Sequence, residues 1–309
     1  MSAYKSIKQL SLLLSENKID VYFGYFLKPV LFGGLAAWLA KVPKRIGMIE
    51  GLGQLFTDSE NGSSLKQLLL RKIFSIQFKF IATKLDYLIV LNKDDKDTLS
   101  KFSPSANIQV LGGIGVDLEE FPYVPLEPRE ITRFIFIGRL LKEKGINYFL
   151  EAAELIKKDF SNAEFHILGT VDLTAKNTIN TALLAKLIKN DVVLHKGYVN
   201  NVSEYLASSS VFVLPSYYRE GVPRSTQEAM ATGRAVITTD SVGCKDTVVN
   251  GYNGYLVEKF NSIDLAEKMK LFLTNLDRAA LMGINGRKLA EDRFDASNIN
   301  KRLMGYIYD

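Results

Sequence analysis

The sequence has 309 residues, of which 47% are hydrophobic and 24% are charged. This length allows two globular domains of ordinary size, and the composition supplies ample material for their cores. The net charge of +5 is mild for such a chain. It suits an anionic ligand or an anionic membrane surface, and we expect no nucleic-acid partner.

The rare residue types exclude several kinds of site. A single cysteine, Cys244, excludes an intrachain disulfide and suggests a reducing compartment. The two histidines, His166 and His195, cannot form a dedicated zinc site with one cysteine, and we expect structural roles for them. The apolar stretch at residues 29–40 is shorter than the roughly 18 to 20 residues that span a bilayer. We therefore expect a cytoplasmic protein that can lie peripherally at the inner face of the cytoplasmic membrane.

Hydrophobic periodicity predicts helices and strands that alternate along the chain. In the first part we expect helices at 2–17, from Pro29, at 64–84 and after a cap at Asn92 or Asp94, with strands at 19–26, 44–49, 87–92 and from 108. In the second part we expect strands from 133, 163, 192, 211, 235 and 255, with helices to about 158 and at 174–189, 202–208 and around 228, and two helices at the end. This alternation predicts a parallel α/β sheet in each part.

A linker marked by Pro122, Pro125 and Pro128 separates the two parts. We therefore predict a first domain at 1–122, a second at 123–290, and a C-terminal helix at 291–309 that packs back toward the first domain. A doubly wound domain usually opens with a strand and a tight glycine turn. This chain opens with a helix, so we expect the first domain to be incomplete at its N-terminus.

The segment from Gly138 to Gly145 has the pattern of an anion site. It follows a predicted strand and leads into a helix, whose N-terminus offers N–H groups and a positive dipole end. Arg139 can contact phosphate oxygens with two N–H groups, and Lys144 adds a point charge. The alternative is a surface turn with two solvated basic residues.

Glu220 follows the apolar strand at 211–216, at the edge of a parallel sheet where ligands bind. Gly221 and Pro223 would let the backbone approach a ligand and set the turn. A carboxylate in this place can accept hydrogen bonds from sugar hydroxyls.

Glu228 lies eight positions further along, on the first or second turn of the next predicted helix. Ser225 and Thr226 are at the start of that helix, where N–H groups are free to bind a ligand. Glu228 would point back to the same sheet edge as Glu220. The alternative for both carboxylates is a helix start favoured by the dipole.

The predicted helix at 61–84 is basic and apolar and holds no acidic residue. Its basic residues are Lys66, Arg71, Lys72, Lys79 and Lys84, and the apolar residues between them include Leu68, Leu69, Ile73, Phe74 and Phe78. Such a helix can lie on anionic lipid. The alternative is a helix half-buried against the sheet with a solvated basic face.

Together, these residues resemble the pattern of glycosyltransferase family 4. That resemblance implies retaining enzymes of the GT-B fold, with two Rossmann-like parallel-sheet domains facing across a cleft. The matching positions are Gly138, Arg139, Leu140, Lys144, Gly145, 211–216, Glu220, Gly221, Val222, Pro223, Glu228, Ala229, Ala231, Gly233, Gly251 and Gly254. Residues 25–53 are similar to the acceptor half of bacterial members that build capsule, O-antigen or lipid-linked oligosaccharides, especially those that add an N-acetylhexosamine to an undecaprenyl-diphosphate-linked sugar.

The resemblance implies a donor site for a nucleotide-sugar, with a UDP-sugar expected. Arg139 and Lys144, beside Gly138, would neutralise the diphosphate and act in catalysis. The turn at Tyr198 and Val199 would lie beside the base. The nucleotide-sugar is a co-substrate, and we expect neither a cofactor nor a divalent metal, because basic side chains and a helix dipole replace the metal's charge.

The resemblance also implies roles around the two carboxylates. Glu228 would hold the ribose hydroxyls. Glu220, a catalytic residue in this pattern, would hold the donor sugar together with the backbone of Gly221, Val222 and Pro223. The anomeric configuration would be kept by a front-face displacement, in which the leaving phosphate accepts the acceptor's proton. The acceptor would be an undecaprenyl-diphosphate-linked or other glycan.

Two departures from the family pattern leave questions open. Glu50 stands where many members carry a histidine, and it could contact an acceptor hydroxyl, cap a helix or form a structural turn. The family also begins with a strand and glycine-rich loop that this sequence lacks at Met1. The alternative function is therefore a remnant that binds nucleotide-sugar without transferring it. A sugar-nucleotide epimerase is a more distant third reading.

Overall fold

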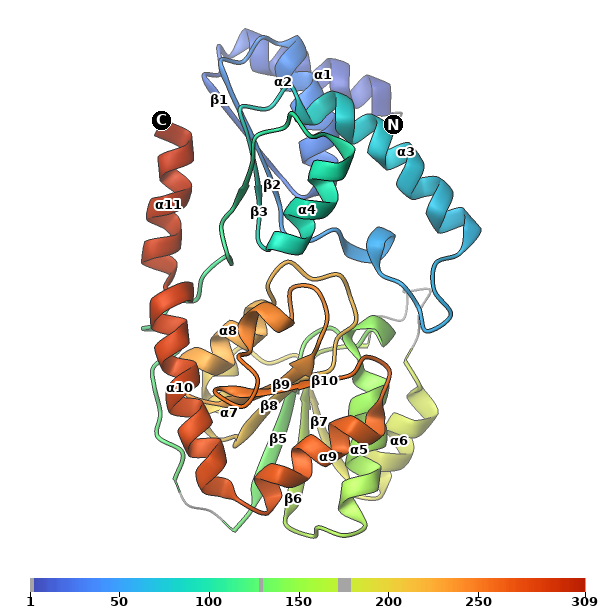
Figure 1. Ribbon diagram of the computed structural model, residues 1–309, viewed down its shortest axis with the longest axis vertical. Coiled ribbons are helices and arrows are strands. Elements are labelled where there is room, and N and C mark those ends of the chain that lie inside the picture. The colour runs from blue at the N-terminus through green and yellow to red at the C-terminus, as the bar shows by residue number, and fades with distance from the viewer. Residues whose placement is uncertain (1–2, 128–129, 172–178, 309) are drawn as a thin grey trace. The chain divides into compact units, whose positions relative to one another are not determined.

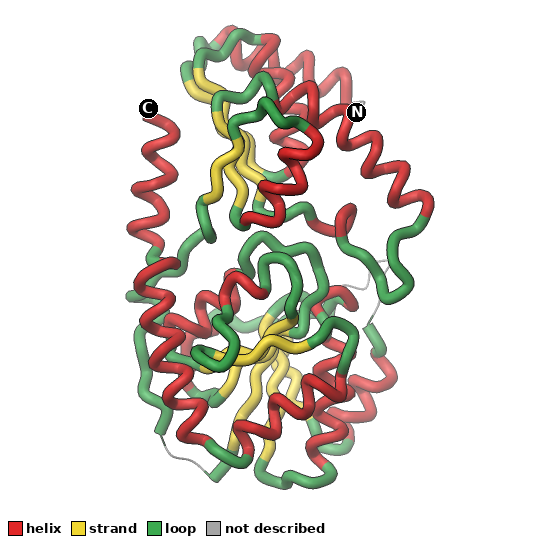
Figure 2. The backbone as a smooth tube through the Cα atoms, in the orientation of Figure 1, coloured by secondary structure: helices red, strands yellow, loops and turns green. Residues whose placement is uncertain are grey.

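A computed structural model describes residues 3–127, 130–171 and 179–308. The chain forms two compact units with strands at the centre and helices outside (Figures 1 and 2). Unit 1 comprises Met1–Ile114, Arg219–Val222 and Ser297–Asp309, and unit 2 comprises Gly115–Tyr218 and Pro223–Ala296. Unit 1 thus takes in a four-residue segment from the middle of the second half of the chain.

Unit 1 is built on a four-stranded parallel sheet in the order β1-β2-β3-β4. Its strands are β1 (Val21–Tyr25), β2 (Lys44–Ile49), β3 (Tyr87–Val90) and β4 (Ile108–Val110). Its helices are α1 (Ala3–Glu16), α2 (Gly34–Leu39), α3 (Leu65–Ala82) and α4 (Lys93–Phe102), and the final helix is α11 (Ala296–Tyr308). These bounds confirm the elements predicted for the first part of the chain.

The core of unit 1 is aromatic where α3 meets the sheet. Phe74 and Phe78 are buried, and their rings stack with centroids 5.5 Å apart. Two side-chain caps start the neighbouring helices. The Ser64 hydroxyl accepts the Gln67 N–H at the start of α3, and Asn92 Oδ1 accepts the Asp95 N–H at the start of α4. Helix α3 therefore has one face fixed in the core.

Unit 2 has a six-stranded parallel sheet in the order β10-β9-β8-β5-β6-β7. Its strands are β5 (Thr132–Ile137), β6 (Ala163–Leu168), β7 (Val193–Gly197), β8 (Val211–Leu214), β9 (Ala235–Thr239) and β10 (Gly254–Val257). Its helices are α5 (Ile146–Lys157), α6 (Thr181–Lys189), α7 (Val202–Ala207), α8 (Arg224–Ala231), α9 (Ser262–Leu273) and α10 (Leu276–Phe294). Helices α5, α6 and α9 cover one face, and α8 and α10 cover the other (Figure 1).

The strand order places a topological switch point in the middle of this sheet. From β5 the chain moves outward through β6 and β7 and then returns to β8 on the other side of β5. In open α/β sheets, ligands bind outside the carboxyl ends of the strands at such a point. A ligand site is therefore expected at the residues that follow β5, β6 and β8.

The compact units depart in detail from the expected domain limits. Unit 1 ends at Ile114 rather than at residue 122, and the segment Arg219–Val222 belongs to it. The helix expected at 291–309 is α11, which begins at Ala296, and its Tyr306 ring lies 5.2 Å from that of Tyr87. Of the helix expected at 174–189, the part up to residue 178 lies outside the described residues, and α6 begins at Thr181.

Two glycines in α10 predict opposite responses to the same substitution. A Cβ on Gly283 would lie 2.0 Å from the Gly233 carbonyl oxygen, whereas one on Gly286 would meet nothing nearer than 3.5 Å. We expect Gly283→Ala to lower the free energy of unfolding by about 1–3 kcal/mol through overpacking. Gly286→Ala should raise it by up to about 1 kcal/mol through helix propensity. Denaturant unfolding of both variants checks this, and stabilisation by both would contradict the close packing.

Candidate active site

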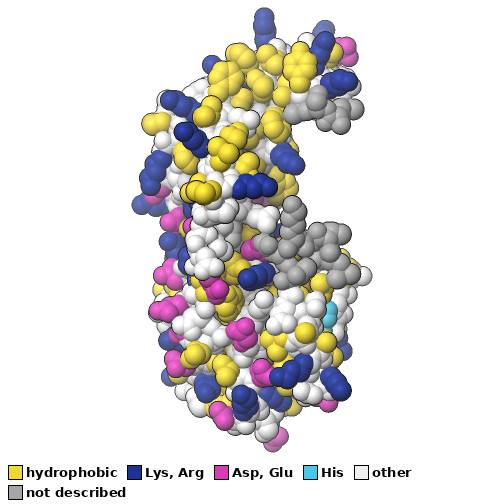
Figure 3. Space-filling model, turned by 90° about the vertical axis from the view of Figure 1, so that its right-hand side faces the viewer, with side chains coloured by type: hydrophobic (Ala, Val, Ile, Leu, Met, Phe, Trp, Pro, Cys, Tyr) yellow, Lys and Arg dark blue, Asp and Glu magenta, His cyan; other side chains and the backbone are white. Residues whose placement is uncertain are grey.

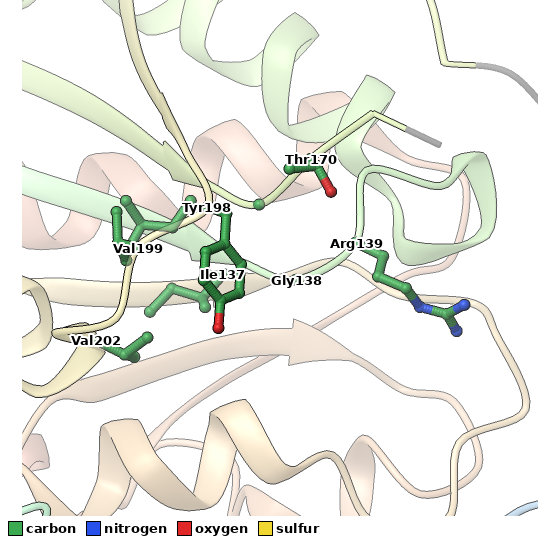
Figure 4. A pocket seen from close by; sticks show the side chains of 9 residues that line it. Ile137, Gly138, Arg139, Thr170, Tyr198, Val199 and Val202 are labelled. Atoms are coloured by element: carbon green, nitrogen blue, oxygen red, sulfur yellow. The ribbon is translucent and has the colours of Figure 1, made fainter. Parts of the chain in front are cut away.

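A pocket of about 240 Å³ lies at the carboxyl ends of β5 and β6 and in the loop after β7 (Figure 4). It is lined by Ile137, Gly138, Arg139, Leu168, Gly169, Thr170, Tyr198, Val199 and Val202. A Cβ on Gly169 would lie 1.9 Å from the Gly138 carbonyl oxygen, so only glycine allows these two loops to approach. The pocket is thus formed at the switch edge of the sheet.

Tyr198 and Val199, which the sequence places beside the base, line this pocket. The Tyr198 ring lies beside Ile137, and the Arg139 side chain extends away from it (Figure 4). Tyr198 is 77% exposed, so its ring has an open face. Sequence reasoning missed Thr170 and Val202, because neither stands in a recognisable motif.

Neither histidine is needed to explain this site. His195 Nε2 lies 2.8 Å from the Gly169 carbonyl oxygen and so supports the backbone of the pocket. His166 is buried in β6, and burial, together with the charge of Arg133, lowers its pKa. The contacts of both side chains are structural.

The predicted anion loop has the expected local structure. Lys142–Lys144 forms a short 3₁₀ turn, and Gly145 has a φ of 79° as the N-cap of α5. The N-cap is a glycine and so supplies no capping side chain, which leaves N–H groups and the positive dipole end of α5 to face an anion. Arg139 is exposed and Lys144 half-buried. A Cβ on Gly145 would lie 1.9 Å from the Pro215 carbonyl oxygen, so this position has no room for any residue other than glycine.

The anion loop is joined to the segment that follows β8. The Glu143 carbonyl accepts hydrogen bonds from the N–H groups of Tyr217 and Tyr218, at 2.9 and 3.0 Å, and from the Ser216 hydroxyl at 3.2 Å. Lys144 Nζ lies 5.7 Å from the centre of the Tyr218 ring. The two loops at the switch point therefore form one structure within unit 2, with a basic side chain at their junction.

Helix α8 carries Glu228 on its second turn, with Ser225 and Thr226 in the first, as the sequence predicts. Thr226 is buried and its hydroxyl donates to the Pro223 carbonyl at 2.6 Å, so that hydroxyl serves the helix start. Arg224 Nε lies 2.9 Å from Glu228 Oε1. Burial raises the pKa of the Glu228 carboxyl, and Arg224 only partly opposes this effect.

Glu220 is buried and belongs to unit 1 with Gly221 and Val222, whereas Pro223 and Glu228 belong to unit 2. The Asn92 amide donates to the Gly221 carbonyl at 2.8 Å, and the Gly53 N–H donates to the Arg219 carbonyl at 3.1 Å. The joint action of the two carboxylates stays a prediction. Sequence reasoning overlooked the contacts of Arg219, although it stands next to Glu220.

Glu50 lies at the end of β2 and has one buried carboxylate oxygen, Oε1, without a hydrogen-bond partner among the described residues. The following short helix, Gly53–Phe56, has Leu52 at its N-cap and no side-chain cap, so Glu50 does not cap it. A buried polar atom normally has a partner. Contact with a ligand hydroxyl therefore remains a candidate role, beside that of a structural turn.

Two negative observations concern only the described part of the chain. Within it, no group of three His, Cys, Asp or Glu side chains is placed to hold a metal ion. No described helix is both long and apolar enough to cross a membrane. The expectation that no metal is required stays a prediction.

Two parallel-sheet α/β units with a pocket at the switch edge define a GT-B fold, and solved structures agree. The structure of HepE from Anabaena in complex with UDP-glucose superposes with a TM-score of 0.80 at 16% identity, covering 97% of this chain and 81% of that one. Residues 117–289 match the family described as glycosyl transferases group 1. The chain belongs to this family of glycosyltransferases.

Two curated relatives match over most of the chain. The UDP-Gal:alpha-D-GlcNAc-diphosphoundecaprenol alpha-1,3-galactosyltransferase of Escherichia coli is 32% identical, covering 97% of this chain and 77% of that protein. The N,N'-diacetylbacillosaminyl-diphospho-undecaprenol alpha-1,3-N-acetylgalactosaminyltransferase of Campylobacter jejuni is 29% identical, covering 87% of this chain and 72% of that protein. Both relatives agree with the resemblance inferred from the sequence.

The raised pKa of Glu228 predicts a dependence of stability on pH. Because the folded protein favours the protonated carboxyl, the stability that Glu228 contributes is present at low pH and is lost as pH rises through the raised pKa. We expect Glu228→Gln to unfold at a higher temperature than the wild type at pH 7, with a smaller difference at pH 4.

The matched control is Glu291→Gln, because Arg287 and Glu291 form a similar i,i+4 pair on α10 but the Glu291 side chain is 49% exposed. This variant should change the melting temperature little at either pH. Thermal melts at both pH values check the prediction, and a destabilised Glu228→Gln at pH 7 would contradict it.

Proposed function

We propose that the protein transfers a sugar, with retention, from a nucleotide-sugar to an undecaprenyl-diphosphate-linked or other glycan acceptor in cell-surface polysaccharide synthesis. The donor is expected to be a UDP-sugar. The observation that carries this proposal is the pocket of unit 2 beside the uncapped start of α5. The names of the two relatives support the acceptor class, and that of the Escherichia coli protein supports the donor class.

The nucleotide would lie with its base in the pocket and its diphosphate at the anion loop. Val199 and the exposed ring of Tyr198 offer apolar surface to a base. In the anion loop, Gly138 and Gly145 keep the backbone open, and the start of α5 would face the phosphates. Arg139 and Lys144 would neutralise the leaving diphosphate, and the Arg139 side chain extends away from the pocket. This electrostatic stabilisation would be the largest contribution to catalysis. It would take the place of a divalent metal.

The two carboxylates would bind the sugars of the donor. Glu228 would accept hydrogen bonds from the ribose hydroxyls, and Glu220 would hold the transferred sugar with the backbone of Gly221 to Pro223. In the reaction, the bond between the anomeric carbon and the phosphate oxygen breaks. The acceptor oxygen bonds to the same face of that carbon, and its proton passes to the leaving phosphate.

The rival function is binding without transfer. Isothermal titration with UDP compared with a transfer assay separates the two, because a binding remnant retains the nucleotide affinity and shows no turnover. We propose a cytoplasmic location, where the protein can also lie peripherally at the inner face of the cytoplasmic membrane.

Two substitutions test the donor roles. We expect Glu228→Ala to weaken UDP binding about tenfold or more, because charge-assisted hydrogen bonds to the ribose are lost. Glu220→Ala should reduce transfer more than it reduces UDP affinity. Glu291→Ala, on the exposed face of α10, serves as the control and should change neither. Unchanged UDP affinity in Glu228→Ala would remove the ribose assignment, and equal losses in Glu220→Ala would count against its contact with the sugar.

We further propose that α3 lies on an anionic membrane surface and so brings unit 1 to a lipid-linked acceptor. Its inner side buries Phe74 and Phe78, yet its outer side still exposes large apolar residues, among them Leu65, Leu69 and Ile76 at 86%, 60% and 65%. Figure 3 shows hydrophobic side chains interspersed with Lys and Arg on this face of unit 1. The outer face is therefore apolar as well as basic, as an interfacial helix requires.

Not every basic residue of the segment belongs to this face. Arg71 pairs with Asp58 at 2.8 Å and donates to the Leu55 carbonyl, so it is held against the protein. Lys84 Nζ lies 5.3 Å from the centre of the Trp38 ring. The exposed cations available to lipid phosphates are Lys66, Lys72 and Lys79.

Replacing Lys66, Lys72 and Lys79 together by Gln should weaken binding to anionic liposomes on the order of 100-fold at low salt, because each cation contributes about 1 kcal/mol. The control replaces the exposed lysines Lys158, Lys189 and Lys288 of unit 2 by Gln, with the same change in net charge. Sedimentation with phosphatidylserine vesicles measures the binding, which should also be lost at high salt. Equal weakening by both triple variants, or no wild-type binding, would overturn the proposal.

A further inference from the structure

The segment that carries Glu220 is held in unit 1 by a buried ion pair. Arg219 Nε lies 2.9 Å from Oδ1 of Asp95, whose side chain is fully buried. The same guanidinium donates from Nη2 to the Thr98 hydroxyl at 2.8 Å. Asp95 Oδ2 in turn accepts from the Asn92 amide at 3.2 Å. Both carboxylate oxygens of Asp95 are thereby bonded, as a buried charge requires.

The backbone of the same segment is held at consecutive residues. The Arg219 N–H donates to the Thr57 hydroxyl at 2.8 Å, and the Arg219 carbonyl accepts from the Gly53 N–H. The Asn92 amide donates to the carbonyls of Glu220 and Gly221, at 3.4 and 2.8 Å. Residues 219–221 are thus held by the short helix Gly53–Phe56, by Thr57 after it, and by Asn92 at the start of α4.

We propose that Arg219, Asp95 and Asn92 are positioning residues for Glu220. Their pairing sets the backbone from which the Glu220 side chain projects, although Tyr218 and Pro223 on either side belong to unit 2. Pre-organisation of a group that contacts the transferred sugar lowers the barrier, and a displacement of about 1 Å can cost on the order of 100-fold in rate. The positioning role for transfer rests on the proposed function.

Arginine is required here because one planar group must contact two acceptors. Arg219 Nε donates to the Asp95 carboxylate, and Arg219 Nη2 donates to the Thr98 hydroxyl. A lysine ammonium at the end of a flexible chain keeps the charge but not this fork. Arg219→Lys therefore loosens the segment without leaving Asp95 unpaired in charge.

The control is Arg133→Lys in unit 2. Arg133 Nε also lies 2.9 Å from a carboxylate oxygen, that of Glu164, and its Nη1 donates to the Ser208 carbonyl. The change is chemically the same, but the pair lies on β5 and β6 of unit 2, whereas residues 219–222 belong to unit 1. If Arg219→Lys fails to fold, Thr98→Val replaces it in the test. That variant leaves the Asp95 pair intact and removes the second contact of the fork, together with the hydrogen bond from the Thr98 hydroxyl to the Asp94 carbonyl.

The first measurement is hydrogen–deuterium exchange of the free protein, which needs no ligand. Arg219→Lys should speed exchange about tenfold or more in peptides that contain the amides of residues 53 and 219, and Arg133→Lys should leave them unchanged. The second measurement compares UDP affinity with transfer. Arg219→Lys should lower kcat on the order of 10- to 100-fold while UDP affinity changes less than about twofold.

Unchanged exchange at residues 53 and 219 would overturn the proposal, and so would equal losses of UDP affinity and kcat. If the wild type bound UDP but showed no transfer, or bound no UDP, the proposed function would fail. The exchange result would then still decide whether this ion pair holds the segment.

Discussion

The backbone at Gly51 and the backbone at Gly221 are packed so closely that neither position has room for a side chain. A Cβ on Gly221 would lie 1.9 Å from the Glu50 carbonyl oxygen, and one on Gly51 would lie 2.5 Å from the Gly221 nitrogen. The residues before these glycines are Glu50 and Glu220. The contact therefore fixes the backbone positions of Glu50 and Glu220 relative to each other within unit 1.

In unit 2, a second backbone contact fixes the anion loop relative to the segment after β8. The Glu143 carbonyl binds the segment after β8 up to Tyr218, and the bonds of the next residue, Arg219, all go to unit 1. The segment after β8 therefore has its hydrogen bonds in unit 2 up to Tyr218 and in unit 1 from Arg219 to Gly221.

The order of elements and much of unit 2 could be predicted from sequence, because their signals are local. The glycines at 138 and 145, the strand before Glu220 and the helix that carries Glu228 are each readable within about ten residues of chain. The pairing of Arg219 with Asp95 spans 124 residues, and Asp95 alone reads as an ordinary acid at a helix start. The outer face of α3 could not be predicted either, because the sequence does not show which of its apolar residues are buried in the core and which are exposed.

Glu228 carries a burial cost in the free protein that the proposed ribose contact would offset. Its carboxylate loses more hydration on folding than its contact with Arg224 restores, as the raised pKa indicates. A neutral side chain would cost the folded protein less. Hydroxyl groups of a bound ribose would donate to the carboxylate and replace the lost water, so the cost of burying the charge would be offset only when the nucleotide is present. On the proposed ribose contact, a charge that is unfavourable in the free protein and satisfied by the ligand would favour a ligand with hydroxyl groups at that position.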